Sequence, residues 1–303
     1  MGNAISSLGS IVRTHSQNIG SKTALVLGDR TQSWSQLYER SMKMANALAA
    51  AGVGSQDRIA FLDKNGIEHF EVLYGAALLN AVSVDVNFRL AGPEVEYIVN
   101  NSEAKVFIVG PDFVPILDAI ADNLTTAKTI VVIGGHSKFQ SYDTFIESGK
   151  AVDPNVPSAD GDVAFQLYSS GTTGRPKGVM LTNDNFLGIL PSARDLWGMN
   201  EHAVNLVAMP LFHIGGCASG EFGAFTAREL RGVDERLLLV AAVARVPHPR
   251  EAHDVDGAVD TEVVVTGDGS DRGEPALHAG RTERVVSVAE DIVVVGDAGE
   301  RRR

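Results

Sequence analysis

The stretch Val163-Ala-Phe-Gln-Leu-Tyr-Ser-Ser-Gly-Thr-Thr-Gly-Arg-Pro-Lys-Gly-Val179 decides how the rest of the chain is interpreted. Its apolar first half predicts a buried strand over 163–168, and a loop rich in glycine, hydroxyl and cationic side chains follows directly. Glycine lets a backbone approach a phosphate group closely, and hydroxyl groups donate to phosphate oxygens or bind Mg²⁺. Lysine adds a compact positive charge. The stretch therefore predicts a phosphate-binding loop at the end of a strand.

The spacing of this loop differs from two widespread phosphate-binding motifs. Pro176 stands five positions after Gly171, where the pattern G-x-x-x-x-G-K-[ST] requires a second glycine. The pattern G-x-G-x-x-G does not occur in this loop either. A plain surface loop of glycine, serine and threonine is the simpler alternative, but the ordered combination after an apolar strand favours a binding loop.

Strand-like and helix-like segments alternate before the loop. Ser33 and Gln36 have the spacing of a capping box at the start of a helix, and Gly52 is a natural stop for it. Further strands are predicted over 58–62, 82–86, 105–109 and 129–133, and further helices over 67–79, 93–99 and 115–124. This order predicts an α/β fold of parallel β-α-β units, with helices on both faces of the sheet.

The loop over 168–178 resembles the signature of the adenylate-forming superfamily, which includes acyl-CoA synthetases, luciferases and the adenylation domains of peptide synthetases. The usual form is Tyr-Thr-Ser-Gly-Thr-Thr-Gly-x-Pro-Lys-Gly, and only Ser169 departs from it, with its hydroxyl kept. Four further stretches resemble acyl-CoA synthetases: 57–65, 74–82, 86–98 and 210–216. The resemblance implies that 1–225 is a partial AMP-binding domain, the incomplete N-terminal part of the large domain of an acyl-CoA synthetase.

The resemblance also implies a reaction. In the family, the loop holds the β- and γ-phosphates of ATP while a carboxylate attacks the α-phosphorus, and the thiol of CoA then displaces AMP from the acyl-adenylate. The matching positions expected to bind the ATP phosphates are Ser169, Ser170, Gly171, Thr172, Thr173, Gly174 and Lys177. Thr172 is also a candidate Mg²⁺ ligand. Arg175 occupies the variable position and is expected to be exposed. The implied ligands are ATP, Mg²⁺, CoA and a carboxylic acid, with fatty acids favoured.

A second site segment lies over 210–216. His213 matches the residue that family members place beside the acyl and CoA tunnels as a gate, and Gly215 and Gly216 would let a substrate pass close to the backbone. The alternative for His213 is a core histidine beside Phe212. Cys217, the one cysteine, is interpreted as a small buried apolar residue.

The composition changes abruptly near residue 226. Every aromatic residue, lysine, methionine and asparagine lies in 1–225, whereas 71 of the 78 residues of 226–303 are Val, Ala, Gly, Arg, Asp, Glu, Pro, His or Leu. All nine types have codons that begin with G or C, which favours a frameshifted reading of a GC-rich gene. A genuine low-aromatic domain or a disordered tail is the alternative. We expect a poorly structured tail whose short Val and Leu runs, such as 237–240, form isolated strands or a short helix.

Several family motifs are expected after residue 225: a glutamate that binds Mg²⁺, an aspartate that holds the ribose, a hinge arginine and a lysine that drives adenylation. No lysine follows Lys177, and Thr266-Gly-Asp268 matches only the core of the ribose motif. We therefore expect the 303-residue polypeptide to be inactive as written. Three hypotheses remain open: an acyl-CoA synthetase whose gene is damaged or truncated here, a relative that loads a carrier protein, and a non-catalytic nucleotide-binding fragment or partner subunit.

Charge and hydropathy restrict the setting. The formal net charge of −12 argues against a nucleic-acid partner. No apolar run reaches the roughly 20 residues of a transmembrane helix. A single cysteine excludes an internal disulfide framework, so we expect a cytoplasmic protein. The N-terminus Met1-Gly-Asn-Ala-Ile-Ser6 lacks the pattern of a signal peptide, although it fits the permissive myristoylation pattern.

Overall fold

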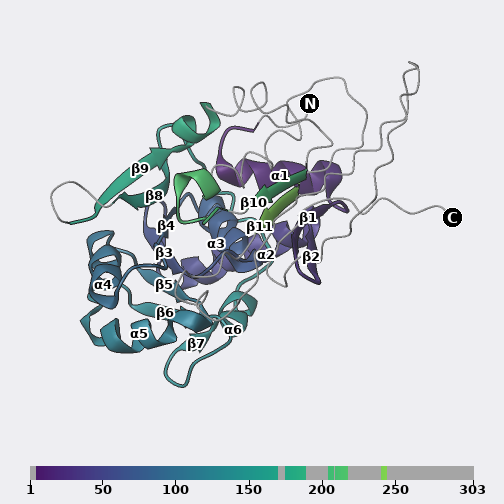
Figure 1. The fold of residues 1–303 in the computed structure, drawn as a ribbon. Helices are drawn as coiled ribbons and strands as arrows, with labels where there is room; N and C mark the ends of the chain where they lie inside the picture. The colour runs from purple at the N-terminus through teal and green to yellow at the C-terminus, as the bar shows by residue number, and fades with distance from the viewer. Residues whose placement is uncertain (1–4, 170–174, 189–203, 208, 218–239, 244–303) are drawn as a thin grey trace, which may run out of the picture.

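The computed structural model describes residues 5–169, 175–188, 204–207, 209–217 and 240–243, and the statements below concern these residues. A seven-stranded sheet forms the centre, in the order β7-β6-β5-β3-β4-β8-β9 (Figure 1). All neighbouring strands are parallel except β9, which runs antiparallel to β8. The strands are β3 (Arg58–Leu62), β4 (Val82–Asp85), β5 (Val106–Val109), β6 (Thr129–Val132), β7 (Gln140–Ser141), β8 (Val163–Ser169) and β9 (Lys177–Thr182).

Helices cover both faces of this sheet, which confirms the predicted α/β architecture. The helices are α1 (Leu8–Ile19), α2 (Trp34–Ala50), α3 (Ile67–Leu78), α4 (Gly92–Asn101), α5 (Val114–Ile120) and α6 (Tyr142–Glu147), with 3-10 turns at Pro111–Phe113 and Ala121–Asn123. Side chains of β3 alternate between two cores. Ile59 and Phe61 join the core that contains residues of α1, α2, α3 and α6, whereas Ala60 and Leu62 join the one under α4 and α5. The alternation follows from the two-residue period of a strand.

The start of α2 follows the predicted capping box. The Ser33 hydroxyl accepts from the Gln36 amide at 3.2 Å, and the Gln36 side chain accepts from the Ser33 amide at 2.8 Å. The helix ends at Ala50, and Gly52 takes a φ of +86°, a conformation that favours glycine. Helix α3 packs so closely against α2 that a Cβ atom at Gly75 of α3 would lie 2.5 Å from Cγ of Met44 in α2. Glycine at this position therefore sets the distance between α2 and α3.

A second sheet of four strands has the order β10-β11-β1-β2. Its strands are β1 (Thr23–Leu27), β2 (Arg30–Ser33), β10 (Val204–Val207) and β11 (Val240–Val243). Strand β11 pairs in parallel with both β10 and β1 (Figure 1). The expectation of an isolated strand in the tail is therefore wrong for 240–243, because backbone pairing on both edges places them inside a sheet. The rest of the predicted tail lies outside the described residues.

The helices in the described part of the chain are too short or too polar to cross a lipid bilayer.

Candidate functional site

The predicted phosphate loop leaves and re-enters the large sheet at one place. Ser169 is the last residue of β8, Lys177 is the first residue of β9, and the two are paired across the antiparallel ladder. Both side chains are exposed. Ser170, Gly171, Thr172, Thr173 and Gly174 lie outside the described residues, so their assignment to ATP phosphates, and of Thr172 to Mg²⁺, remains a prediction. The structure thus places a hydroxyl and an ammonium group opposite each other at the two ends of the loop.

The position of the loop follows from the sheet. Strand β8 is parallel to β4, which is parallel to β3, so the segments after all three strands lie at the carboxyl edge. In open α/β sheets, ligands bind outside this edge. The loop after β8 therefore lies where the topology favours a nucleotide.

Helix α4 contacts both ends of the loop. The Tyr168 hydroxyl donates to Asn101 Oδ1 at 2.8 Å, and the Arg175 guanidinium carbon lies 5.3 Å from the centre of the Tyr97 ring. Burial raises the pKa of Tyr168, which keeps its hydroxyl protonated as a donor. Tyr97 and Asn101 are four residues apart and hence on one helix face. Arg175 is exposed, as expected, and together with Pro176 it borders a cavity of about 600 Å³ against α4.

The segment around His213 forms a turn followed by a helical turn at 214–217. The His213 ring is exposed, so the alternative of a core histidine is wrong. Its Nδ1 accepts from the Gly215 amide at 3.1 Å, which leaves Nε2 to carry the proton of the neutral ring. Phe212 packs edge-on against Phe88 with ring centres 5.0 Å apart. The role of His213 beside an acyl tunnel remains a prediction.

The two glycines of this segment have close neighbours. A Cβ atom at Gly215 would meet the methyl group of Met209, and one at Gly216 would meet the carbonyl group of Pro210. Close backbone packing thus requires glycine at Gly216, whereas the flexible Met209 side chain could move away from a Cβ atom at Gly215. The passage of a substrate beside the two glycines stays a prediction. Cys217 is 1% exposed, which confirms its interpretation as a small buried residue.

The phosphate-loop segment and the 210–216 segment meet at the same edge of the sheet, beside residues that follow adjacent strands. Asn65 follows β3 and bonds the backbone on both sides of Pro210, at the Met209 carbonyl and the Leu211 amide. Phe88, which follows β4, packs against Phe212. Because the predicted phosphate loop begins at the end of β8, its first residue, Ser169, and the His213 turn share the carboxyl edge of β3, β4 and β8. The sequence pattern did not indicate the role of Asn65, since both its partners are distant along the chain.

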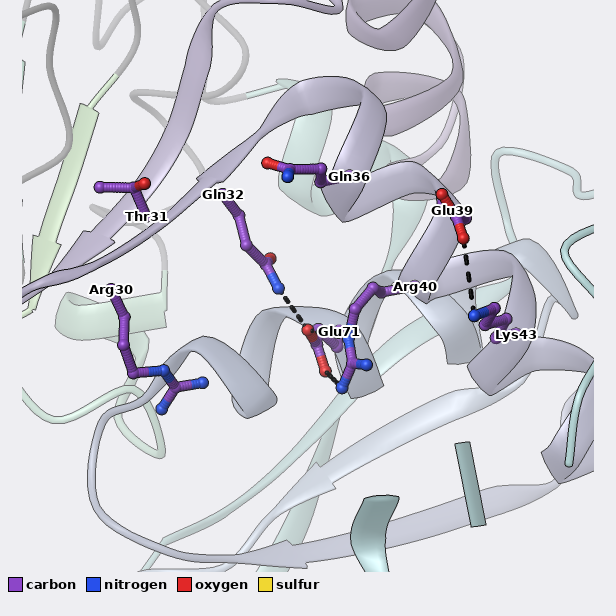
Figure 2. A pocket seen from close by; sticks show the side chains of 8 residues that line it. All are labelled: Arg30, Thr31, Gln32, Gln36, Glu39, Arg40, Lys43 and Glu71. Carbon is purple, nitrogen blue, oxygen red and sulfur yellow. Dashed lines mark hydrogen bonds and ion pairs between the residues drawn. The ribbon is translucent and has the colours of Figure 1, made fainter. Parts of the chain in front are cut away.

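Figure 2 shows a second cavity, of about 420 Å³, between β2, α2 and α3. Gln32 and Arg40 point toward the Glu71 carboxylate, whose side chain is 1% exposed and which also accepts from Tyr142. The cavity is lined by Arg30, Thr31, Gln32, Gln36, Glu39, Arg40, Lys43 and Glu71. The arginines and the lysine all have carboxylate partners in this part of the structure. The Arg40–Glu71 pair is the buried part of this set, whereas Arg30 and Lys43 pair with carboxylates near the surface, and charge patterning alone did not reveal these pairs.

A buried histidine and aspartate face each other at the carboxyl end of β4. His69 Nε2 and Asp85 Oδ2 are 3.9 Å apart, and neither atom has a hydrogen-bond partner within the described part of the chain. The other Asp85 oxygen accepts from the Ser83 hydroxyl at 2.9 Å. Burial lowers the pKa of His69 and raises the pKa of Asp85. The low-dielectric interior thus opposes the charge of both side chains.

A mainly parallel α/β sheet with a glycine- and hydroxyl-rich sequence after one of its strands is typical of nucleotide-binding proteins. Comparison with known families makes this assignment specific: the family of AMP-binding enzymes matches residues 12–228. The chain belongs to the AMP-binding enzyme family.

Individual relatives agree with this assignment. The chain is 33% identical over 221 residues to the fatty acid–[acyl-carrier-protein] ligase ScoC of Streptomyces coeruleorubidus, covering 70% of this chain and 41% of the relative. It is also 33% identical over 206 residues to the long-chain-fatty-acid–CoA ligase FadD13 of Mycobacterium tuberculosis, covering 68% and 39%. The anthranilate CoA ligase AuaEII, solved in complex with anthranoyl-AMP, superposes with a TM-score of 0.64 at 27% identity, covering 73% and 43%. The chain spans about two fifths of the length of these curated relatives.

Proposed function

We propose that the chain carries the ATP-phosphate-binding part of an AMP-forming ligase that joins a carboxylic acid, of the fatty-acid class, to a thiol. The observation that carries the proposal is the pairing of Ser169 with Lys177 at the carboxyl edge of the sheet. This pairing holds a hydroxyl donor and a cation at the two ends of a glycine-rich loop. The family match and the ligases among the relatives support the same chemistry.

The proposed residues act on charge and position. Attack of a carboxylate oxygen on the α-phosphorus of ATP forms an acyl-adenylate and breaks the bond to the β-phosphate, so pyrophosphate leaves with the negative charge. Lys177 would neutralise that charge, and Ser169 with the loop hydroxyl groups would donate to the phosphate oxygens. Such chemistry depends mainly on positioning and electrostatic stabilisation. Mg²⁺ bound with the nucleotide would add further charge compensation, with Thr172 as the proposed ligand.

The acid and its acceptor belong to the second segment of the site. His213 is proposed to line the acyl tunnel, with Gly215 and Gly216 beside it. CoA is the proposed acceptor, as in the named activity of FadD13, and transfer to a carrier protein is the alternative that the named activity of ScoC favours. Mixing an isolated acyl-adenylate with the protein and either CoA or a carrier protein, and measuring which acceptor forms a thioester, would distinguish the two.

The division of the chain is part of the proposal. Residues 1–225 would form the partial adenylation domain, and 226–303 would derive from a shifted reading frame. The family match ends at residue 228, close to the change in composition, which supports this boundary. Resequencing the gene across codons 215–235 tests it. An uninterrupted frame would overturn the frameshift.

The phosphate-binding role predicts the effect of Lys177→Ala on nucleotide binding. A hydrogen bond to a charged group contributes about 1.5–3 kcal/mol, so the Kd for MgATP should rise roughly 10- to 100-fold in isothermal titration calorimetry. Lys138→Ala, which removes another exposed lysine, should leave the Kd unchanged. The 303-residue polypeptide should release no AMP in response to fatty acid. Equal ATP affinity in the Lys177 and Lys138 variants would contradict the assignment.

A further inference from the structure

The Asn65 side chain joins the end of β3 to a segment more than 140 positions later. It is buried, with 5% of its surface exposed, and its Nδ2 donates to the Met209 carbonyl at 3.0 Å. Its Oδ1 accepts from the Leu211 amide at 2.9 Å. Because a carbonyl only accepts and an amide only donates, these partners fix which amide atom points each way. Asn65 thus holds the backbone on both sides of Pro210.

A second contact holds the same segment from the neighbouring strand. Phe212 packs against Phe88, and the Arg89 guanidinium carbon lies 5.1 Å from the Phe88 ring centre and 5.5 Å from that of Phe212. Phe88 and Arg89 follow β4, whereas Asn65 follows β3. The turn is therefore held from two adjacent strands of a rigid sheet.

The position of His213 depends on this hold. The His213 amide donates to the Pro210 carbonyl at 3.1 Å, and its carbonyl accepts from the Gly216 amide at 2.9 Å. In the same segment as the exposed His213 ring, Met209 and Ile214 are 48% and 44% exposed. A segment that exposes an imidazole and two apolar side chains suits an acid that carries an apolar chain.

We propose that Asn65 is the positioning residue of the acid-binding segment. It acts through the backbone of 209–211, sets the place of His213, and does not touch the substrate itself. The inference rests on the proposed function, because only there does His213 line the path of the acid.

Hydrogen exchange of the ligand-free 303-residue protein tests the positioning directly. In Asn65→Ala, amides of 211–217 should exchange at least tenfold faster, since their anchor to β3 is lost, while amides of β3 and β4 should be unchanged. Asn183→Ala is the matched control. Asn183 is 3% exposed and also bonds two distant backbone groups, the Leu8 amide at 3.3 Å and the Ala159 carbonyl at 3.2 Å. Unchanged exchange at 211–217 in Asn65→Ala would overturn the proposal.

Calorimetry with two ligands then distinguishes a local effect on the acid-binding segment from a general loss of structure. Palmitate should bind at least tenfold more weakly to Asn65→Ala, while the Kd for MgATP should stay within twofold of the wild type, and Asn183→Ala should bind both as the wild type does. Asn65→Asp adds a signature that depends on pH. At neutral pH its carboxylate has no proton to donate to the Met209 carbonyl. It gains one as the pH falls, because burial raises the pKa of a carboxyl group, so palmitate binding relative to the wild type should partly recover at acidic pH.

Three further results of the calorimetry would each overturn the inference. Equal weakening of palmitate and MgATP in Asn65→Ala would indicate a merely structural role and overturn the inference. A wild-type protein that binds MgATP without palmitate would overturn the inference and leave the phosphate site intact. A wild-type protein that binds neither would overturn the proposed function, and this inference with it.

Discussion

Arg40→Ala is expected to lower the free energy of unfolding by about 3–5 kcal/mol, because it leaves the buried Glu71 carboxylate without its charged partner. Arg40 Nη2 donates to Glu71 Oε2 at 3.0 Å, and its Nε donates to the other oxygen. The Glu71 side chain is only 1% exposed, and its remaining donors, Gln32 and Tyr142, are both uncharged. Urea unfolding followed by far-UV circular dichroism measures the change.

Removing the other partner of the pair, by Glu71→Ala, should lower the free energy of unfolding by less. After Glu71→Ala, Arg40 still borders the water-accessible cavity of about 420 Å³ and lies 3.4 Å from the exposed Glu147. The cost is then that of donors left without their acceptor, about 1–3 kcal/mol. The double variant Arg40→Met, Glu71→Leu should recover most of the lost stability, because apolar residues of similar size replace buried ion pairs well.

A surface ion pair supplies the control for this series. Arg30→Ala breaks the pair with Glu68, in which the arginine side chain is 55% exposed, and should cost less than about 1 kcal/mol. Equal destabilisation by Glu71→Ala and Arg40→Ala would show that the cavity does not hydrate the arginine, and would contradict the expected difference.

Asp85→Asn is expected to stabilise the protein at neutral pH by about 1–3 kcal/mol, the usual cost of a buried group without a partner. The amide can still accept from the Ser83 hydroxyl at Oδ1, and its new Nδ2 donor would face the unpartnered Nε2 of His69. Urea midpoints measured at several pH values test both the sign and the shape of the effect.

The pH dependence follows from the two opposite pKa shifts. Burial raises the pKa of Asp85, so the folded state binds the extra proton, and stability falls as pH rises from the ordinary aspartate value through the raised one. Burial lowers the pKa of His69, so the unfolded state binds the extra proton, and stability falls as pH drops below about 6.5. Asp85→Asn should remove the first slope and keep the second.

Asp57→Asn is the matched control of opposite sign. Partial burial would raise the pKa of Asp57, but the hydrogen bonds from Lys105 and the Gly54 amide hold it below its ordinary value. Its charge therefore stabilises the folded state, and the amide should destabilise it. A loss of stability in Asp85→Asn at neutral pH would show that the carboxylate is needed in the core.

Local signals predicted much of the large sheet. The capping box of Ser33 and Gln36 begins α2 as expected, and the strands over 58–62, 82–86, 105–109 and 129–133 end within a residue of the predicted positions. Secondary-structure propensity and hydrophobic periodicity depend on residues that are close together in the sequence, so a local sequence pattern can reveal them. Helix α1 was missed because serine, Ser10, completes its capping box where glutamate or glutamine is the usual signal.

Long-range contacts account for what the pattern did not predict. Strand β9 has largely exposed side chains, with Val179 and Met180 near half exposure, so it lacks the signature of a buried strand. The Glu71 network and the Asn65 contacts join residues from separate elements. Within the site, the sequence indicated the two ends of the loop, Ser169 and Lys177, but not the side chains that hold the second segment in place.

The central place of β11 in the small sheet has a consequence for synthesis on the ribosome. Leu25 of β1 pairs with Ala241, so the hairpin of β1 and β2 emerges long before its neighbour exists. At 5–20 residues per second, translating the roughly 200 intervening residues takes on the order of 10–40 s. Throughout that interval the nascent chain presents an open strand edge, the surface on which chains associate. A chaperone that shields the emerging N-terminus should therefore raise the yield of folded protein.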